Sequence, residues 1–275
     1  MKYLCFFLLL SLNTRAAVFT VTNTDDAGPN SLRQAILDAN MTPAPDIIHF
    51  DIPGGGPHQI FLASSLPIIN NPVDIDATTQ PGWVLSNIVL DGQNAINQGF
   101  RLEAVDCKVS GLHLKNFIFI VIEAFDADNL IVQDCLINNL MSEEGTGIFL
   151  QDCNNVLIED CKIGTNADGT LEESGNGVVG ILTLGLTNSS IRNCQLSGFF
   201  QPSLNRGWGI FLDGNGNTGN QIFDNLIGVN ATATAAIPNN IGIQISQDSG
   251  NNLLTNNIIG GNVLGGIVLQ TMGGF

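Results

Sequence analysis

A seven-residue pattern that recurs through the second half of the chain constrains the fold more than any other feature. Each copy reads aliphatic, two variable residues, Cys or Asn, one variable residue, aliphatic, and then Gly or a polar residue. Five copies begin at Val132, Ile158, Ile191, Ile222 and Leu254, and a weaker copy begins at Val109. The dipeptide Gly-Ile follows each of the five, at residues 147–148, 180–181, 209–210, 242–243 and 266–267. Two markers in a constant order indicate a structural repeat of 23 to 33 residues.

A unit of this length with several short strands cannot bury its own apolar face, so its copies must stack as the coils of a solenoid. A helical repeat is excluded because the apolar residues are spaced by two and three positions and not at i, i+4 and i+7. Among the 275 residues are 31 Gly and 32 Asn, which accept the left-handed backbone that the bends of a parallel β-helix require. We therefore predict an all-β fold, a parallel β-helix solenoid.

Each position of the repeat should form a column along the stack, with about 4.8 Å between coils. We expect two aliphatic columns to point inward, one from Val132 to Leu254 and one from Ile137 to Ile259. The fourth position should lie at a bend, where Asn side chains can form an amide ladder and the small, easily buried Cys can take the same place. This column holds Cys135, Cys161, Cys194, Asn225 and Asn257.

Residues 1–17 have the pattern of a secretory signal peptide. Lys2 precedes an apolar run from Tyr3 to Leu12, and the small residues Ala16 and Ala17 follow. The run is too short to span a bilayer, and no later segment reaches eighteen consecutive apolar residues. We therefore expect no transmembrane helix and an exported protein, either secreted or at the cell surface in association with the outer membrane.

The cysteines that remain after removal of the signal peptide should be free and buried. They number five, so at least one has no partner within the chain. Neighbouring side chains of the stacked column run parallel, which would keep their Cβ atoms about 4.8 Å apart, whereas a disulfide prefers ~3.8 Å.

The charge balance excludes one class of partner. Beyond residue 17 the chain has seven Lys and Arg against 25 Asp and Glu, a net charge of −18. Such a surface cannot neutralise a phosphate backbone, so we expect no binding to nucleic acid.

Residues 18–45 should form a strand and a short helix that precede the β-helix of residues 46–275. The expected helix runs from Ser31 to Asn40, and Ser31 with Gln34 makes a capping box at its start. One apolar stripe of this helix faces the core. A solenoid must cover its open end, so we expect the helix to cap the first coil. The stripe comprises Leu32, Ala35, Ile36 and Ala39.

The other end of the solenoid has no such element. The last coil, from Gly265 to Phe275, stops without a capping helix. The sequence is therefore expected to be either a truncated product or an open stack that self-associates, because an open end exposes unpaired backbone.

The segment from Val21 to Asn40, which contains Ser31-Leu-Arg-Gln-Ala-Ile36, resembles the N-terminal CSLREA-like segment of exported bacterial β-helix proteins. Asn30 stands where that motif has Cys, and Gln34 where it has Glu. Residues 52–56, 73–82 and 88–92 and the Asn-rich coils are also similar to these proteins. The resemblance implies a right-handed parallel β-helix of the pectin-lyase-like superfamily in a surface or secreted setting. It implies no reaction, since fold alone does not determine function.

Calcium is the one cofactor that the residues leave open. Pectate-lyase-like chemistry needs carboxylates that hold Ca²⁺ and a cationic side chain as base. The candidate ligands are Asp134, Asp160 and Asp224, in a column beside Arg192. The alternative, which we favour, is a solvated edge whose Asp and Asn side chains stabilise turns. No catalytic residue is predicted.

Two functions remain open. The first is an adhesin-like or ligand-binding surface protein without catalysis, whose partner is a carbohydrate or a host or cell-surface protein. Phe199, Phe200 and Trp208 could form its contact patch, although these side chains could equally fold back over the core. The second is a polysaccharide lyase or glycosidase that acts on acidic glycans with calcium. The strong negative charge disfavours it, because such a protein repels an acidic substrate.

Overall fold

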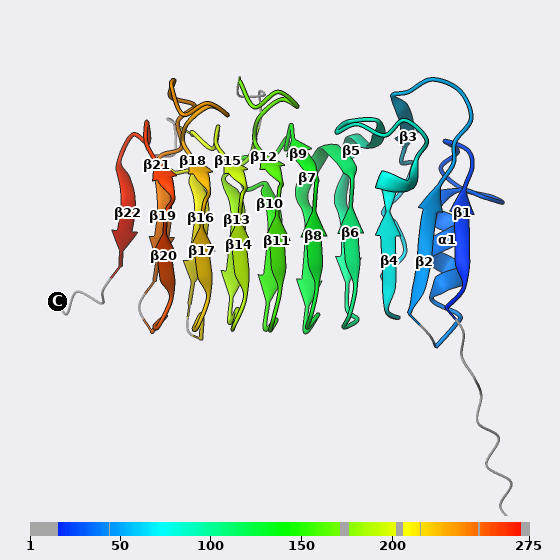
Figure 1. Ribbon diagram of the computed structural model, residues 1–275, viewed down its shortest axis with the longest axis horizontal. Helices are drawn as coiled ribbons and strands as arrows, with labels where there is room; N and C mark the ends of the chain where they lie inside the picture. Colours follow the sequence, from blue (N-terminus) through cyan, green and yellow to red (C-terminus); the bar gives the residue numbers. More distant parts are fainter. Residues whose placement is uncertain are drawn as a thin grey trace, which may run out of the picture.

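The computed structural model describes residues 16–43, 45–170, 176–201, 206–214, 216–246 and 248–270. The strands wind into a parallel β-helix in which each coil stacks on the one before it (Figure 1). Neighbouring strands of both sheets run parallel. The predicted all-β parallel solenoid is therefore confirmed.

One sheet of nine strands, sheet A, follows the whole length of the solenoid. It begins with β1, so the predicted N-terminal strand is part of the solenoid wall. In spatial order the strands are β1 (Val18–Val21), β2 (Asp46–Phe50), β4 (Val73–Asp76), β6 (Lys108–Ser110), β8 (Ile131–Gln133), β11 (Leu157–Glu159), β14 (Ser190–Arg192), β17 (Gln221–Phe223) and β20 (Leu253–Thr255).

The second sheet, sheet B, has thirteen strands and supplies two walls of the solenoid. The strands β5 (Ile88–Leu102) and β7 (Leu112–Phe125) are long enough to belong to both walls. One wall has short strands: β3 (His58–Phe61), β9 (Leu136–Asn138), β12 (Lys162–Ile163), β15 (Gln195–Leu196), β18 (Leu226–Ile227) and β21 (Ile258–Ile259). The other has longer strands: β10 (Thr146–Gln151), β13 (Val179–Leu184), β16 (Trp208–Asp213), β19 (Ile241–Ile245) and β22 (Gly265–Leu269).

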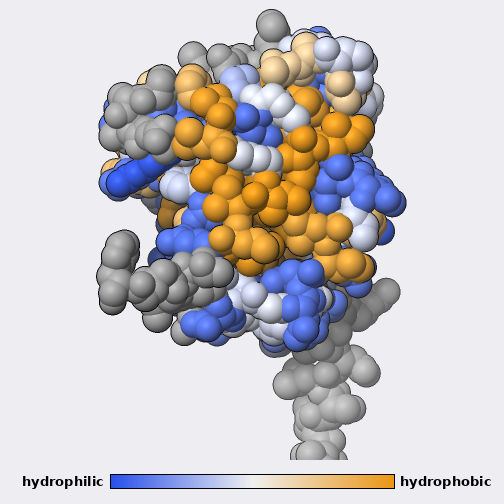
Figure 2. Space-filling view, turned by 90° about the vertical axis from the view of Figure 1, so that its left-hand side faces the viewer, coloured by the Kyte–Doolittle hydropathy of each residue, from blue (hydrophilic) through white to orange (hydrophobic). Residues whose placement is uncertain are grey.

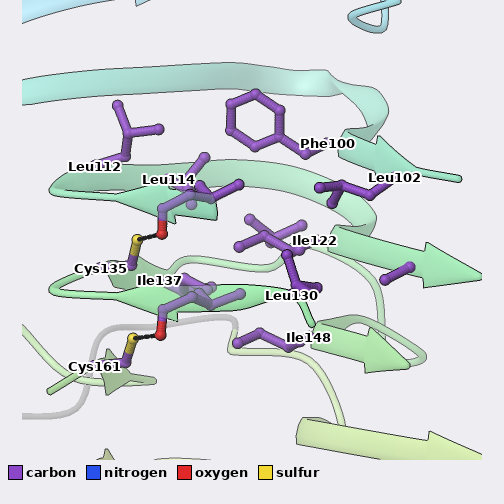
Figure 3. Packing of buried hydrophobic residues seen from close by; sticks show 14 of the residues in the cluster. Phe100, Leu102, Leu112, Leu114, Ile122, Leu130, Cys135, Ile137, Ile148 and Cys161 are labelled. Atoms are coloured by element: carbon purple, nitrogen blue, oxygen red, sulfur yellow. Dashed lines mark hydrogen bonds between the residues drawn. The ribbon is translucent and has the colours of Figure 1, made fainter. Parts of the chain in front are cut away.

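The repeat predicts the register of the coils correctly. Val132 pairs with Ile158, and the same column continues through Ile191 and Ile222 to Leu254. The second aliphatic column runs in register from Ile137 through the next coils to Ile259. These side chains are buried or, in the last coil, half-buried. Figure 3 shows the second column and the column of the longer strands from within, with Ile137 below Leu114 and Ile148 below Ile122.

The Gly-Ile marker has a steric cause. The five Ile side chains are in register along the longer strands, and the Gly that precedes each of the first four lies against the backbone of the next coil. A Cβ atom on Gly147, Gly180 or Gly209 would come within 2.6, 2.5 or 2.8 Å of the carbonyl oxygen of the following Gly. Only glycine allows the coils to approach this closely.

The Cys and Asn column lies at the bend between sheet A and the short strands. All five cysteines of the described residues are free and buried, as predicted. Each thiol of the column donates to a carbonyl of the preceding coil, from Cys135 to Val109 at 3.7 Å and from Cys161 to Val132 at 3.6 Å (Figure 3). Cys therefore takes the place that Asn occupies in later coils.

The predicted helix is α1 (Leu32–Ala39), which packs beside β1 and β2 at the N-terminal end (Figure 1). Ser31 caps it by accepting a hydrogen bond from the Gln34 N–H at 3.2 Å. Only half of the capping box forms, since the Gln34 amide donates to Asp38 at 2.8 Å. The four predicted stripe residues are buried in the core of the first coil. A short 3-10 helix, η1 (Ala77–Thr79), follows β4. Across the described ranges no helix is long and apolar enough to cross a membrane.

Candidate functional site

The column of candidate calcium ligands consists of residues in the left-handed backbone conformation. Asp134, Asp160 and Asp224 have φ angles of 51°, 54° and 57°, and Asn193 and Asn256 at the same position have 52° and 55°. Asp and Asn are the side chains that best tolerate this conformation after Gly. The turn at the end of each sheet A strand therefore accounts for the residue types of this column.

The three carboxylates have unequal surroundings. Asp134 is half-buried, whereas Asp160 and Asp224 are exposed. Burial raises the pKa of Asp134, and the neighbouring charges of Asp160 and Glu159 raise it further. In the part of the chain that the structure describes, no group of three or more His, Cys, Asp or Glu side chains could hold a metal ion. Calcium binding here stays a prediction.

Two of the candidate ligands line a lateral cavity of about 490 Å³. Asp160 and Asp224 lie two coils apart, with Asn193 of the intervening coil between them. Two coils correspond to about 10 Å, too far for two carboxylates to share one cation directly. Lys162 and Gln195 also line the cavity, whereas Asp134 does not.

Two similar loops lie beside the cavity, and Ala231 of the second loop lines it. Residues 164–170 and 228–234 stack on each other, with the Ala231 N–H donating to the Gly169 carbonyl at 2.7 Å. The Gln195 amide ties the loops together by donating to Gly169 at 2.8 Å and to Val229 at 3.0 Å. The Lys162 ammonium donates to the carbonyl of Ala167, so this cation is partly engaged at the rim.

Arg192, the cationic side chain beside the acidic column, is engaged on the outer face of sheet A. Its guanidinium pairs with Glu159 of the preceding coil at 2.6 Å and lies 6.0 Å from the ring centre of Phe223 in the next coil. This pairing follows the register of Glu159, Arg192 and Phe223. To act as the base that abstracts a proton, Arg192 would have to leave Glu159.

The three predicted contact residues differ in their exposure to solvent. Phe199 is fully buried, and its ring packs on the backbone of Gly164 and Gly180, where a Cβ atom would come within 2.8 and 3.0 Å of a ring carbon. Phe199 therefore folds back over the core, which was the alternative for this residue, and it is not accessible to a ligand. Phe200 and Trp208 are half-buried. Trp208 lies on β16, in register with Val179 and Ile241.

Trp208 belongs to an aromatic surface that the repeat analysis missed. Along β10, β13 and β16, side chains alternate between the buried core and the outer face. The outward positions are largely aromatic or aliphatic where a solvated sheet would be polar. This aromatic ridge comprises Phe125, Phe149, Leu182, Leu184, Trp208 and Phe211, all half-buried.

The rings of the ridge are ordered by contact. Trp208 and Phe211 stack with ring centres 5.1 Å apart and an interplanar angle of 20°. Phe125 and Phe149 meet edge to face at 5.8 Å and 76°. The Arg101 guanidinium lies 4.7 Å from the ring centre of Phe125. All three arrangements are favourable geometries for aromatic rings, so the ridge presents a fixed surface.

Hydrogen-bonding side chains border the ridge. The Trp208 indole N–H donates to Gln244 at 2.7 Å, and the Gln244 amide donates to Gln270 at 2.9 Å. Asp213 accepts from the Ser246 hydroxyl at 3.0 Å.

One sequence signal could have found the ridge, since Gly-Ile-Phe-Leu occurs at both 147–150 and 209–212 and puts Phe in the outward position.

The fold and its outer surface define a parallel β-helix protein with an aromatic lateral face. Residues 86–274 match the family model described as the right-handed beta helix region, and the chain belongs to this family. No curated protein shows significant similarity to the chain.

Proposed function

We propose that this protein is an exported, adhesin-like binding protein that holds a carbohydrate on its aromatic ridge without cleaving it. The observation that carries the proposal is the stacked pair Trp208 and Phe211 on a sheet face that points away from the core. Exposed aromatic side chains with ordered geometry contribute most of the free energy in many binding sites.

The border of the ridge favours a carbohydrate over a purely apolar partner. A sugar ring offers a C–H face to an aromatic ring and hydroxyl groups at its edge. Asp213 lies half-buried at the end of β16 beside the Trp208–Phe211 pair, and its carboxylate can accept hydrogen bonds from such hydroxyls. The net charge of −18 beyond residue 17 favours a neutral glycan, because an acidic one would be repelled.

The expected export supports this setting. The charged start and apolar run of residues 1–17 fit a signal peptide, and such a protein meets glycans outside the cell or at its surface, in association with the outer membrane. Fractionation of cells that produce the full chain tests this part. Recovery of the intact, unprocessed chain in the cytoplasm would contradict it.

A glycan array with the exported chain, followed by calorimetry on the best neutral ligand, tests the binding. Trp208→Ala should weaken binding by about tenfold or more, and Trp208→Phe should retain part of it. Phe223→Ala is the matched control, because Phe223 is a half-buried aromatic on the outer face of sheet A. Equal losses in Trp208→Ala and Phe223→Ala, or binding only to a cell-surface protein, would contradict the proposal.

One observation favours a second candidate, a polysaccharide lyase or glycosidase that acts on acidic glycans with calcium. Asp160, Asp224 and Lys162 line one lateral cavity, where carboxylates could bind cations that bridge to the substrate. Incubation with pectate and alginate, with and without Ca²⁺, tests this. Unsaturated or reducing-end products that disappear in Asp160→Asn would support the enzyme, and no product in any condition would eliminate it.

A further inference from the structure

The outer walls of the solenoid are where it can hold a small ligand. Seen along the solenoid, apolar residues occupy the middle of the last coil, and polar residues lie around them (Figure 2). In the coils behind it, this middle is a core of buried aliphatic and aromatic side chains. A site for a small ligand is therefore expected on the outside, and one lies on the wall of short strands.

A cavity of about 220 Å³ opens on the outer face of this wall. Val89 and Leu136 line it with side chains that lie outside the core cluster and are nevertheless only 2 and 1% exposed. Loops border it as well, with Pro57 and Ser86 from earlier coils and Ala167 from a later one. The cavity is smaller than the roughly 300–1,000 Å³ of drug-sized sites, so it suits a ligand of one ring.

His113 lines the cavity, and Asn138 fixes its orientation. The His113 Nε2 lies 3.1 Å from the Asn138 Oδ1. The Asn138 Nδ2 donates to the carbonyl of Thr165 at 3.0 Å, and a carbonyl can only accept. Oδ1 is therefore the acceptor of the pair, and Nε2 carries the proton.

This tautomer leaves Nδ1 of His113 as a hydrogen-bond acceptor. Nδ1 has no hydrogen-bond partner among the described residues, and it is not one of their buried unpartnered atoms. It is therefore open to a donor on a ligand. Burial lowers the pKa of His113, and the charge of Lys115 lowers it further, so the imidazole is neutral at neutral pH.

Lys115 supplies donors at the same cavity. It lies two residues after His113 on the same face of β7, and its ammonium is 3.7 Å from the carboxylate of Asp91. This separation is longer than a hydrogen bond, so the ammonium keeps donors for a ligand. Asp91 offsets the charge of Lys115, so the cavity suits a neutral ligand. The other polar side chains that line it are uncharged: Gln59, Ser86, Asn138 and Asn166.

We propose that this cavity binds one ring of a neutral sugar, which donates a hydroxyl hydrogen bond to Nδ1 of His113 and accepts one from Lys115. The C–H face of such a ring can pack on Val89 and Leu136. The site is separate from the aromatic ridge, because β7 carries His113 near its start and the ridge residue Phe125 at its end. The proposal does not depend on what the ridge binds, and it gives the protein binding sites on two different walls.

NMR of the ¹⁵N-labelled chain tests the proposal, because the chemical shift of each imidazole nitrogen shows whether it carries a proton or accepts a hydrogen bond. The probes are the methyl glycosides of glucose, galactose and mannose. Without a probe at pH 7.5, we expect His113 to carry its proton on Nε2. At least one probe should shift Nδ1 saturably, with a dissociation constant on the order of 1 mM, as a few hydrogen bonds provide. The shifts of His49 and His58 serve as internal references.

Ala167→Trp should abolish the shift, because Ala167 is half-buried at the cavity and an indole there would fill it. Ala231→Trp is the matched control: it changes the same position of the similar loop 228–234, which lines the other cavity, and it should keep the shift. Lys115→Met removes the donor and should weaken binding by about tenfold. Trp208→Ala should leave the shift unchanged, which separates this site from the ridge.

The absence of a shift at His113 with every probe up to about 100 mM, roughly 100-fold above the expected constant, would overturn the proposal. So would a proton on Nδ1 in the free protein, or a shift that Ala167→Trp preserves or Trp208→Ala removes. Circular dichroism verifies that each variant is folded. If Ala167→Trp does not fold, Lys115→Met decides, and unchanged affinity in that variant would overturn the proposal.

Discussion

The Asn225 carboxamide accepts a hydrogen bond from the backbone N–H of Cys194, the residue that precedes it in the same column, at 2.9 Å. Its NH₂ group donates to the carbonyl of Ile191 at 2.9 Å. One fully buried side chain thus satisfies a donor and an acceptor of the preceding coil. The Cys194 thiol can only donate, and the acceptors within its reach are the carbonyls of Arg192 at 3.1 Å and of Ile158 in the preceding coil at 3.8 Å. Where Asn replaces Cys along the column, the side chain therefore both donates to and accepts from the backbone of the preceding coil, whereas the thiol only donates.

Asn225→Ala should lower the free energy of unfolding by about 1–3 kcal/mol, because it leaves the buried Cys194 N–H without its acceptor and removes a donor to the Ile191 carbonyl. Asn225→Cys should cost less, since its thiol can donate to Ile191 in the way that Cys194 donates to Ile158. Urea denaturation followed by circular dichroism measures both. Equal losses for the two variants would show that the column depends on side-chain volume alone.

The five thiols should be unreactive in the native protein and free after denaturation. All five are buried, and burial raises the pKa of Cys107 and Cys153 to about 11. Thiolate is the reactive form, so native protein at pH 8 should resist alkylation. Thiol titration of denatured, unreduced chain should then find all five. A count of three or one would mean that one or two disulfides had formed.

The same thiols predict a loss of stability at alkaline pH. For Cys107 and Cys153 the thiol pKa is about 9 in the unfolded chain and about 11 in the folded protein, so between these pH values the unfolded chain ionises while the folded protein keeps both thiols protonated. The stabilisation is complete below pH 9 and is lost as the pH rises toward 11. The melting temperature should fall over this window, and it should fall less in C107S/C153S. Parallel profiles for the two proteins would contradict this cause.

The register was predictable because side-chain direction in a strand has a period of two. Knowing that Val132 and Ile137 face inward therefore places their neighbours as well. The cavity beside Gln195 is lined mainly by residues that the repeat places, such as Asp160, Asn193 and Asp224. Its presence was not predictable, because the stacked loops 164–170 and 228–234 beside it lie outside the repeat. Phe199 is buried because its ring packs on Gly164 and Gly180, which belong to other coils. A contact between residues so far apart cannot be predicted from the local sequence pattern.

Asp134→Asn should slightly stabilise the protein at neutral pH. The substitution keeps a residue that tolerates the left-handed φ of 51°, and it removes a charge that Asp160 and Glu159 repel. Because Asp134 is only half-buried, solvent screening limits the gain to less than about 1 kcal/mol. The raised pKa means that the penalty on the charged form disappears in acid, so the difference should vanish as the pH falls below the pKa of the carboxyl. Thermal melts at pH 7 and pH 3 measure this difference in stability.

Asp134→Ala is the control. Because Ala does not tolerate the left-handed backbone, this variant should lower the stability of the protein at both pH values.

Phe199→Ala should reduce stability far more than binding. The side chain is fully buried against Gly164 and Gly180, and removing such a ring costs about 3–5 kcal/mol through lost contacts and the cavity that remains. Phe223→Ala is the control, because Phe223 is half-buried on the outer face of sheet A and should cost roughly 1 kcal/mol, near the centre of measured substitutions. Urea denaturation compares the two. If the folded Phe199→Ala protein lost glycan binding while its free energy of unfolding matched that of Phe223→Ala, Phe199 would be a contact residue, and its place in the core would be wrong.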